Sequence, residues 1–191
     1  DSIVILCPEP WMQQTRDLLR RYCPDCCDKI AVEAGGATRN DTVRNAISYF
    51  CENSNVDENS ILVTHDAVRP FVSHRIIEEN VQAAIGFGAC DTVVPATDTI
   101  VQSDDGALIS AIPDRSKLYQ GQTPQSFNLL ELKQLMSSLS SDEEAILTDA
   151  CKIYTLRGRK VALVRGDVSN MKITYPHDLR VASALMGNSR A

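Results

Sequence analysis

Short apolar runs alternate with amphipathic segments along most of this chain. The runs are rich in β-branched residues, which is typical of strands buried on both faces of a sheet, and they lie at 2–7, 30–33, 60–65, 92–95 and 160–164. Between them, apolar side chains recur at helical spacing at 8–22, from 41, at 76–85, 128–139 and 147–154, and from 174. This alternation predicts βαβ units, and therefore a Rossmann-like α/β fold with a mainly parallel sheet flanked by helices.

One stretch interrupts the alternation after the fourth run. Residues 97–102 and 107–112 have the pattern of two strands around an Asp-Gly turn at Asp105 and Gly106, which predicts a β-hairpin. A hairpin inserted in an α/β chain is more often an arm than part of the core. We therefore predict a single domain over 1–191 with a protruding hairpin arm at about 97–114.

Composition and charge exclude several classes of protein. The 191 residues are 43% hydrophobic and 23% charged, which is enough apolar material for a folded core. Acidic residues outnumber basic ones by 25 to 19, with a formal net charge of −6, whereas a duplex-binding protein normally carries a basic face. Every apolar run is much shorter than the roughly 20 residues that span a bilayer. We therefore expect neither nucleic acid nor a membrane as a partner.

The cysteines indicate a reducing compartment. Their number is odd and they are scattered, whereas a secreted disulfide framework has an even number in a shorter chain. They are Cys7, Cys23, Cys26, Cys27, Cys51, Cys90 and Cys151. The cluster at 23–27 could contribute to a zinc site, but such a site needs four ligands and no second CxxC or paired histidine follows. We therefore predict reduced thiols at the end of a helix, in a cytoplasmic protein.

Three loops lie where ligands bind in an open parallel sheet, beyond the carboxyl ends of the strands. The first begins with two glycines, which let backbone N–H groups approach an anion at the N-terminus of the next helix. An ordinary strand-to-helix turn explains this pattern about as well. The loop consists of Gly35, Gly36, Ala37, Thr38, Arg39, Asn40, Asp41 and Thr42.

The other two loops carry a carboxylate and a lysine. Asp66 directly follows an apolar strand, a position suited to holding Mg²⁺, although it could equally cap the next helix with Arg69 as its ion pair. His65 is more often hydrogen-bonded structure than a catalyst at such a position. Lys172 lies between Met171 and Ile173, and this apolar flank favours a side chain that points into a cleft.

Taken together, these loops and the segments between them resemble one family. The matching stretches are 35–42, 65–70, 98–99, 113–115, 122–125, 148–149 and 170–174. Their order and spacing are similar to those of the sugar-alcohol-phosphate cytidylyltransferases, which include enzymes for 2-C-methyl-D-erythritol 4-phosphate and for D-ribitol 5-phosphate. The resemblance covers essentially the whole chain. It implies a fold of the nucleotide-diphospho-sugar transferase type.

The resemblance also implies a reaction and residues for it. CTP and D-ribitol 5-phosphate would give CDP-ribitol and pyrophosphate, for surface polymers of the teichoic acid type. Residues 35–42, Asp66 and Ala67 would bind CTP, and Asp66 would hold the Mg²⁺ that bridges its phosphates. Lys172 and Arg115 would be catalytic and grip the acceptor phosphate. The hydroxyl donors to the substrate would be Thr99, Thr123 and Thr148.

The family also implies a homodimer formed through the arm, in which Thr99 and Arg115 complete the partner's site. Arg69 would hold the loop that carries Asp66.

Residues 119–127 and the Val-Arg-Pro-Phe ending at Phe71 look closer to the ribitol branch, with the methylerythritol phosphate activity as the nearest alternative. The family's first strand and its Gly-rich loop find no counterpart before Ser2, so we expect this chain to lack them. Ala37 and Ser169 stand where some relatives carry Asp. A non-catalytic dimerising relative is the alternative from another class.

Overall fold

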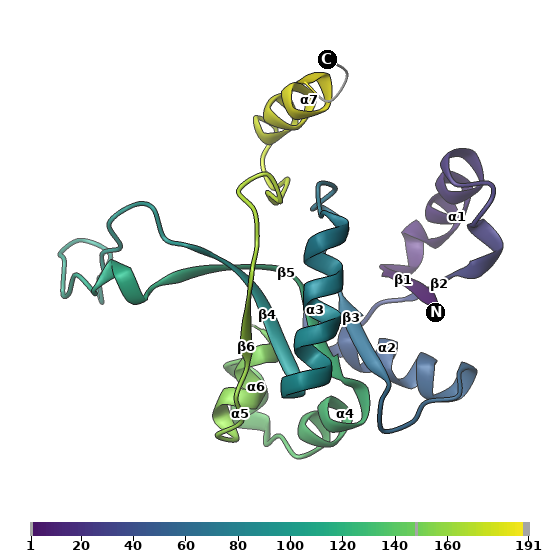
Figure 1. Cartoon of the computed structure of the whole chain (residues 1–191), viewed down its shortest axis with the longest axis horizontal. Helices are drawn as coiled ribbons and strands as arrows, with labels where there is room; N and C mark the ends of the chain where they lie inside the picture. The colour runs from purple at the N-terminus through teal and green to yellow at the C-terminus, as the bar shows by residue number, and fades with distance from the viewer. Residues whose placement is uncertain (1, 148, 189–191) are drawn as a thin grey trace. The chain divides into compact units, whose positions relative to one another are not determined.

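The computed structural model describes residues 2–147 and 149–188, and the chain divides into two compact units. The first unit comprises residues 1–62 and 128–159, and the second comprises 63–127 and 160–191. Figure 1 labels the helices and strands. Among the described residues, no helix combines the length and apolar character needed to cross a lipid bilayer.

The first unit opens with two parallel strands. β1 (Ile3–Cys7) pairs with β2 (Ile30–Ala34), from Ile3 opposite Ile30 to Cys7 opposite Ala34. The crossover between them contains the short 3₁₀ helix η1 (Glu9–Trp11), helix α1 (Met12–Tyr22) and a second 3₁₀ helix, η2 (Cys27–Lys29). β1 was predicted to be buried on both faces, and this is wrong, because its side chains are exposed or half-buried in a sheet of two strands.

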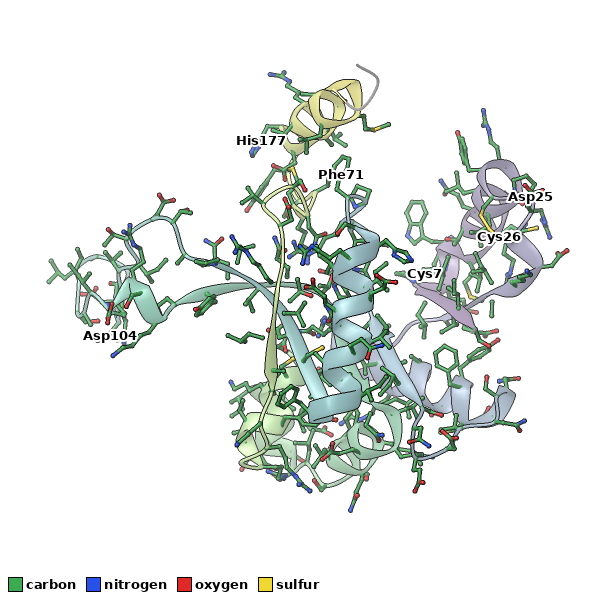
Figure 2. All side chains as sticks on the ribbon, viewed as in Figure 1. Cys7, Asp25, Cys26, Phe71, Asp104 and His177 are labelled. Carbon is green, nitrogen blue, oxygen red and sulfur yellow. A yellow bond between two sulfur atoms is a disulfide. The ribbon has the colours of Figure 1, made fainter. Side chains whose placement is uncertain are left out.

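A disulfide joins Cys23 and Cys26 between α1 and η2, and its yellow bond lies by the Cys26 label in Figure 2. The prediction that these two thiols are reduced is therefore wrong. The backbone N–H of Cys26 donates to the carbonyl of Cys23 in a tight turn, which places the two Cα atoms 5.6 Å apart, within the range that a disulfide bridges. Among the described residues, this is the disulfide that forms, and the other five cysteines are not disulfide-bonded.

Among the described residues, four helices build the remainder of the first unit. They are α2 (Arg39–Asn53), α4 (Leu129–Ser137), α5 (Ser141–Ala145) and α6 (Ala150–Leu156). α4 packs against both α2 and α6, and each of these three helices buries one apolar face. The buried apolar side chains of these helices include Val43, Ile47, Leu129, Leu132, Met136, Ile153 and Tyr154. Helical spacing of apolar positions therefore predicted these elements correctly, apart from α5, which was not predicted.

Most residues of a four-stranded sheet of order β3-β5-β4-β6 belong to the second unit. The strands are β3 (Ile61–Thr64), β4 (Ala89–Pro95), β5 (Tyr119–Asn128) and β6 (Ala162–Arg165). β4 runs antiparallel to β5 and parallel to β6. Helix α3 (His74–Phe87) packs on β4 and β6, as Figure 1 shows. This sheet thus contains both a parallel and an antiparallel pair, and its helical cover has the predicted α/β character.

A buried polar network fastens α3 to the sheet. The side-chain amide of Asn80 donates to Thr92 Oγ1 over 2.8 Å, and Thr92 Oγ1 donates to the carbonyl of Pro124 over 2.6 Å. Burial raises the pKa of the neighbouring Cys90 thiol to about 11. Because buried polar groups are costly unless they are hydrogen-bonded, this network fixes how β4 and β5 meet the helix.

The predicted arm reverses direction as expected but forms no regular strands. Within 97–114 one antiparallel bridge joins Gln102 to Ala111, where the sequence predicted two strands. The Asp105 carboxylate accepts the N–H groups of Ala107 and Leu108, so the side chain organises the turn that Asp-Gly predicted. Figure 2 places Asp104 near the end of this arm, and the 3₁₀ helix η3 (Arg115–Lys117) follows it.

The last helix begins later than the sequence predicted. α7 spans Asp178–Asn188, whereas helical spacing suggested a start at Thr174. The carboxylate Oδ2 of Asp178 accepts the N–H groups of Thr174 and Tyr175, each over 2.8 Å. These backbone hydrogen bonds lower the pKa of Asp178. Residues 174–177 are therefore folded back as a turn onto the Asp178 side chain, and the helix begins only there.

Candidate active site

Asp66 lies just beyond the carboxyl end of β3 and faces two cations. Lys172 Nζ is 3.2 Å and Arg69 Nε is 3.6 Å from the same carboxylate oxygen, Oδ2. The side chains of Asp66 and Arg69 are 23% and 11% exposed, whereas Lys172 is 49% exposed. A half-exposed lysine at the edge of a partly buried pair can reach a ligand. The structure thus brings together the carboxylate and the lysine that were predicted from separate loops.

Arg69 links the Asp66 loop to the loop after β6. Its guanidinium Nη1 donates to the backbone carbonyl of Asn170 over 2.8 Å, and its backbone N–H donates to the carbonyl of Asp66 over 2.9 Å. The sequence left two alternatives for Asp66: a Mg²⁺ ligand, or a cap of the next helix that is paired with Arg69. Arg69 is its ion pair, as one alternative held, but the side chain that caps α3 belongs to Ser73.

The side chain of Thr123 contacts the backbone of Asp66. Its hydroxyl oxygen accepts the N–H of Asp66 over 3.0 Å and lies 3.0 Å from Nδ1 of His65. The residue is 4% exposed. The structure therefore places Thr123 beneath the Asp66 loop, where its hydroxyl group holds this loop.

The loop after β6 is held by a buried glutamine. The side chain of Gln122 donates to the carbonyl of Asp167 over 2.9 Å and accepts from the side-chain amide of Asn170 over 3.3 Å. A Cβ atom at Gly166 would lie 2.3 Å from Oε1 of Gln122, so only glycine allows this close approach. Hydrogen bonds from the Ser169 side chain and backbone lower the pKa of the Asp167 carboxyl.

A cavity of about 550 Å³ lies beside these loops, entirely within the second unit. Its wall includes Arg69, Thr97, Gln122, Arg165, Asp167 and Lys172. Three of these side chains are cationic, and the others offer hydroxyl, amide or carboxylate groups. The volume lies in the range of small-molecule sites, and the charge suits a phosphorylated, hydroxyl-rich ligand.

The glycine loop belongs to the first unit, where it begins α2. A Cβ at Gly36 would lie 2.2 Å from Cβ of Asp41, so the close turn requires glycine. The N–H of Gly36 donates to Thr42 Oγ1 over 3.0 Å, and that of Thr38 donates to Asp41 Oδ2 over 3.1 Å. The hydrogen bond from the Thr38 hydroxyl lowers the pKa of Asp41. Thr38 and Asp41 thus form the capping box of α2.

Two residues in the second half of this loop contact the segment that precedes α6. Arg39 Nη1 lies 3.9 Å from Asp149 Oδ2, and the side chain of Asn40 donates to the carbonyl of Leu147 over 3.0 Å. Gly35 donates its N–H to the carbonyl of Cys7 over 2.8 Å, at the end of β1. Ala37 is exposed in the turn. The loop residues proposed for CTP are therefore held by contacts within the first unit.

The other predicted site residues lie in different surroundings. Ala67 is exposed in the turn after Asp66, and Thr99 is exposed near the start of the arm. Arg115 Nη1 donates to the carbonyl of Thr97 over 2.7 Å, and Thr97 lines the cavity. Thr148 lies outside the described residues.

The implied divalent cation can be tested against the donor set. Among the described residues, no group of three or more His, Cys, Asp or Glu side chains could enclose a metal. Mg²⁺ in nucleotide sites is usually held by one or two carboxylates, with substrate phosphates and water completing its shell. Asp66, half-shielded at the carboxyl end of a strand, fits that arrangement as a single protein ligand.

Sequence reasoning assigned no role to Gln122, Asn170 or Arg165. Gln122 and Asn170 are buried polar residues at 8% and 0% exposure, and they hold the loop that carries Lys172. Both lie within the stretches that match the family, and buried amides beside a strand end are the signal that could have identified them. Arg165, in the cavity wall, ends β6, the same kind of position as Asp66 after β3.

Comparison with known proteins shows similarity over nearly the whole chain. Residues 1–188 match the family model described as IspD: 2-C-methyl-D-erythritol 4-phosphate cytidylyltransferase. A solved 4-diphosphocytidyl-2C-methyl-D-erythritol synthase from Anaerococcus prevotii DSM 20548 is 25% identical, with a TM-score of 0.80 over 98% of this chain and 79% of that chain.

Two further solved structures give the same result. A 4-diphosphocytidyl-2C-methyl-D-erythritol synthase is 28% identical, with a TM-score of 0.80 over 97% of this chain and 82% of its own. The 2-C-methyl-D-erythritol 4-phosphate cytidylyltransferase from Thermus thermophilus is 29% identical, with a TM-score of 0.69 over 82% of this chain and 73% of its own. The Rossmann-like α/β fold predicted from the sequence is confirmed by this similarity.

Proposed function

The chain belongs to the 2-C-methyl-D-erythritol 4-phosphate cytidylyltransferase family and is a CTP-dependent nucleotidyltransferase, and from this premise we propose that its acceptor is a short polyol phosphate, D-ribitol 5-phosphate. The products are then CDP-ribitol and pyrophosphate. The observation that carries a polyol phosphate acceptor is the placement of Asp66, Arg69 and Lys172 together, with both cations at the wall of the cavity.

The proposed chemistry needs positioning and positive charge rather than a general base. An oxygen of the acceptor phosphate attacks the α-phosphorus of CTP, a new P–O bond forms, and the bond to the pyrophosphate leaving group breaks. Phosphate monoesters are already largely ionised at pH 7 because their second pKa is about 6, so no proton must be removed first. Lys172 and Arg69 supply fixed positive charge where negative charge gathers.

Asp66 would hold a divalent cation against the triphosphate, and that cation, when bound, would neutralise charge on the phosphate oxygens. The side chain is already oriented by two cationic partners on Oδ2. Arg69, tied to the carbonyl of Asn170, keeps the Asp66 loop beside Lys172. The chain therefore contributes a carboxylate and a lysine in fixed relation, which is what an entropically costly two-substrate reaction requires.

The second candidate acceptor is 2-C-methyl-D-erythritol 4-phosphate. It is favoured by the family match over 1–188 and by the names of the similar solved structures, whereas the stretch 119–127 favours ribitol phosphate. Both are short polyol phosphates, so one phosphate-binding lysine serves either. Pyrophosphate release from CTP should be measured with each acceptor over a concentration series. A kcat/KM at least about tenfold higher for ribitol 5-phosphate, equivalent to about 1.4 kcal/mol of transition-state discrimination, supports the proposal, and the reverse order supports the alternative.

We also propose that the chain forms a homodimer through the arm. Apolar side chains gather there, with Leu108, Ile109 and Ile112 respectively 73%, 61% and 62% exposed. An isolated two-stranded hairpin is at best marginally stable in water, and this arm has only one bridge. A second copy that covers the arm would bury these side chains, and Thr99 and Arg115 at its base would then lie near the partner's site.

A further inference from the structure

His65 precedes Asp66 and contacts two groups that shape its loop. Its Nε2 lies 3.0 Å from the carbonyl oxygen of Arg69, and its Nδ1 lies 3.0 Å from Oγ1 of Thr123. A carbonyl oxygen only accepts hydrogen bonds, so Nε2 must carry a hydrogen. In the neutral ring Nδ1 is then the acceptor, and the hydrogen on Thr123 Oγ1 points towards it.

These assignments give a chain of hydrogen bonds with a single direction. The N–H of Asp66 donates to Thr123 Oγ1, the Thr123 hydroxyl donates to His65 Nδ1, and His65 Nε2–H donates to the carbonyl of Arg69. The N–H of Arg69 donates in turn to the carbonyl of Asp66. The imidazole therefore spans the turn from residue 66 to residue 69 and closes it from the side of β5.

We propose that His65, as the neutral Nε2–H tautomer, is a positioning residue for the Asp66 carboxylate, acting through Thr123 and the Arg69 carbonyl. The proposal rests on the proposed function in that it gives Asp66 a metal to position. Asp66 Oδ2 has its two cationic partners only while this turn keeps its shape. A misplacement of about 1 Å in a reacting constellation is enough to cost a large factor in rate.

This arrangement gives Thr123 a different role from the substrate-hydroxyl donor suggested by the family resemblance. If Thr123 donated directly to the polyol phosphate, its loss would affect only the binding of that substrate. Removal of His65 would then leave the contact between Thr123 and the substrate unchanged. A positioning pair acts as one unit, so the loss of either partner removes the same support. The two roles therefore predict different effects of the double variant, and they differ in which substrate's kinetic constants change.

The test uses four variants of the full-length protein and measures pyrophosphate release against Mg²⁺, CTP and the acceptor. Thr123→Val removes the hydroxyl with little change of shape, and Thr123→Ser retains it. His65→Gln retains a donor for the Arg69 carbonyl but has no acceptor at the position of Nδ1, which faces Thr123. We expect Thr123→Val and His65→Gln each to lower kcat/KM by about 10- to 100-fold and to raise the Mg²⁺ requirement, as is usual when the support of a metal ligand is lost.

The double variant Thr123→Val/His65→Gln is expected to be no worse than the poorer single variant, and Thr123→Ser is expected to stay within about threefold of the unchanged protein. Multiplicative losses in the double variant would overturn the proposal. A Thr123→Val defect confined to the KM of the acceptor, with His65→Gln unaffected, would overturn it in favour of direct substrate binding.

A second readout is independent of turnover. Long-range ¹H–¹⁵N spectra of the imidazole should show the Nε2–H tautomer for His65, and the Asp66 amide should exchange with solvent faster in Thr123→Val than in Thr123→Ser. An Nδ1–H tautomer, or unchanged exchange, would overturn the proposal even in an active enzyme. If the unchanged protein transfers no cytidylyl group to either acceptor, the proposed function fails, while the spectra still decide the hydrogen-bond chain.

Discussion

The ammonium nitrogen of Lys172 lies 3.2 Å from the Asp66 carboxylate. The two residues come from loops more than a hundred positions apart, and both belong to the second unit. Because Arg69 contacts the same oxygen, one carboxylate orients two cations at the wall of the cavity. A change at Asp66 therefore affects both the proposed metal ligand and the cations that would face the phosphates.

The first prediction concerns Asp66→Asn. The amide keeps the shape of the side chain but lacks the negative charge. That charge would bind the divalent cation, and it pairs with Lys172 and Arg69. We expect a fall in kcat of about 10²- to 10³-fold, the size seen when one charge-stabilising group is lost, with a folded protein by circular dichroism. The measurement is pyrophosphate release across a Mg²⁺ series.

The matched control for that change is Glu78→Gln, which also removes one carboxylate charge from the second unit. Glu78 is 65% exposed on α3, next to His74, so its loss should leave kcat nearly unchanged. Full activity of Asp66→Asn at limiting Mg²⁺ would remove Asp66 from the metal site. An equal loss in both variants would point to net charge rather than to this carboxylate.

The second prediction compares two glycine-to-alanine changes. A Cβ at Gly36 would come within 2.2 Å of Cβ of Asp41 and 2.7 Å of its backbone carbon, whereas a Cβ at Gly86 in α3 would meet nothing within 4 Å. Overpacking of this kind typically costs about 1–3 kcal/mol, so Gly36→Ala should lower the free energy of unfolding by that amount. Gly86→Ala should raise it by up to about 1 kcal/mol, because alanine is the better helix former.

Urea unfolding monitored by circular dichroism measures both changes. If Gly36→Ala is as stable as the unchanged protein, the close turn before α2 is not as tight as the geometry indicates. In the proposed enzyme Gly36→Ala should also raise the KM for CTP, whereas Gly86→Ala should leave it unchanged.

Local side-chain periodicity was sufficient to predict most elements of this fold. β2 and α3, for example, are each indicated by a β-branched run or by helical spacing of apolar residues. β5 (Tyr119–Asn128) was missed, because it is polar and contains Gly121 and Pro124, residues that are depleted in strands. Six successive residues of β5 are nevertheless buried. Their burial comes from neighbouring elements of the chain, which the local sequence does not reveal.

The candidate site was predictable in its parts but not in its connections. Asp66 and Lys172 could be singled out because each follows a strand, but their ion pair depends on which strands are neighbours. The hydrogen bonds of Thr123 depend in the same way on the position of β5 beside β3. The disulfide between Cys23 and Cys26 depends on a tight local turn, whereas the prediction of reduced thiols rested on the number of cysteines in the whole chain.

The third prediction is that Arg115 acts in the partner's site. In this structure its guanidinium donates to the carbonyl of Thr97 at the base of the arm, close to where the proposed dimer would bring the second copy. Arg115→Ala and Lys172→Ala should each be inactive alone. In a mixed two-fold dimer one of the two sites contains neither lesion, so random mixing should restore about a quarter of the unchanged activity.

Subunit exchange must be verified for that experiment, for example by mass spectrometry of differently labelled copies. With exchange verified, no recovery would mean that Arg115 works within its own subunit or outside the site. A monomer by sedimentation at assay concentration would overturn the dimer itself. Lys160→Ala, which removes an exposed lysine of the second unit, serves as the control for Lys172→Ala.

The fourth prediction concerns the pH dependence of stability in the first unit. Glu143 accepts hydrogen bonds at Oε2 from Arg157 over 2.8 Å and from the N–H of Ser140 over 2.9 Å. The hydrogen bond from Arg157 contributes most to lowering the pKa of Glu143, from 4.5 to about 2. A carboxyl whose pKa is lower in the folded state stabilises that state above its unfolded value, and this stabilisation is lost as the pH falls from about 4.5 towards 2.

Glu143→Gln should therefore lower the urea midpoint most at neutral pH, and its difference from the unchanged protein should shrink below about pH 4.5 and vanish near pH 2. Glu52→Gln, an exposed carboxyl on α2 in the same unit, should show a small difference at every pH. Arg157→Lys, which keeps the charge but loses the forked geometry, should fall between the two. If the Glu143→Gln difference stays constant from neutral pH down to about pH 2, the contribution of Glu143 comes from packing and not from its charge.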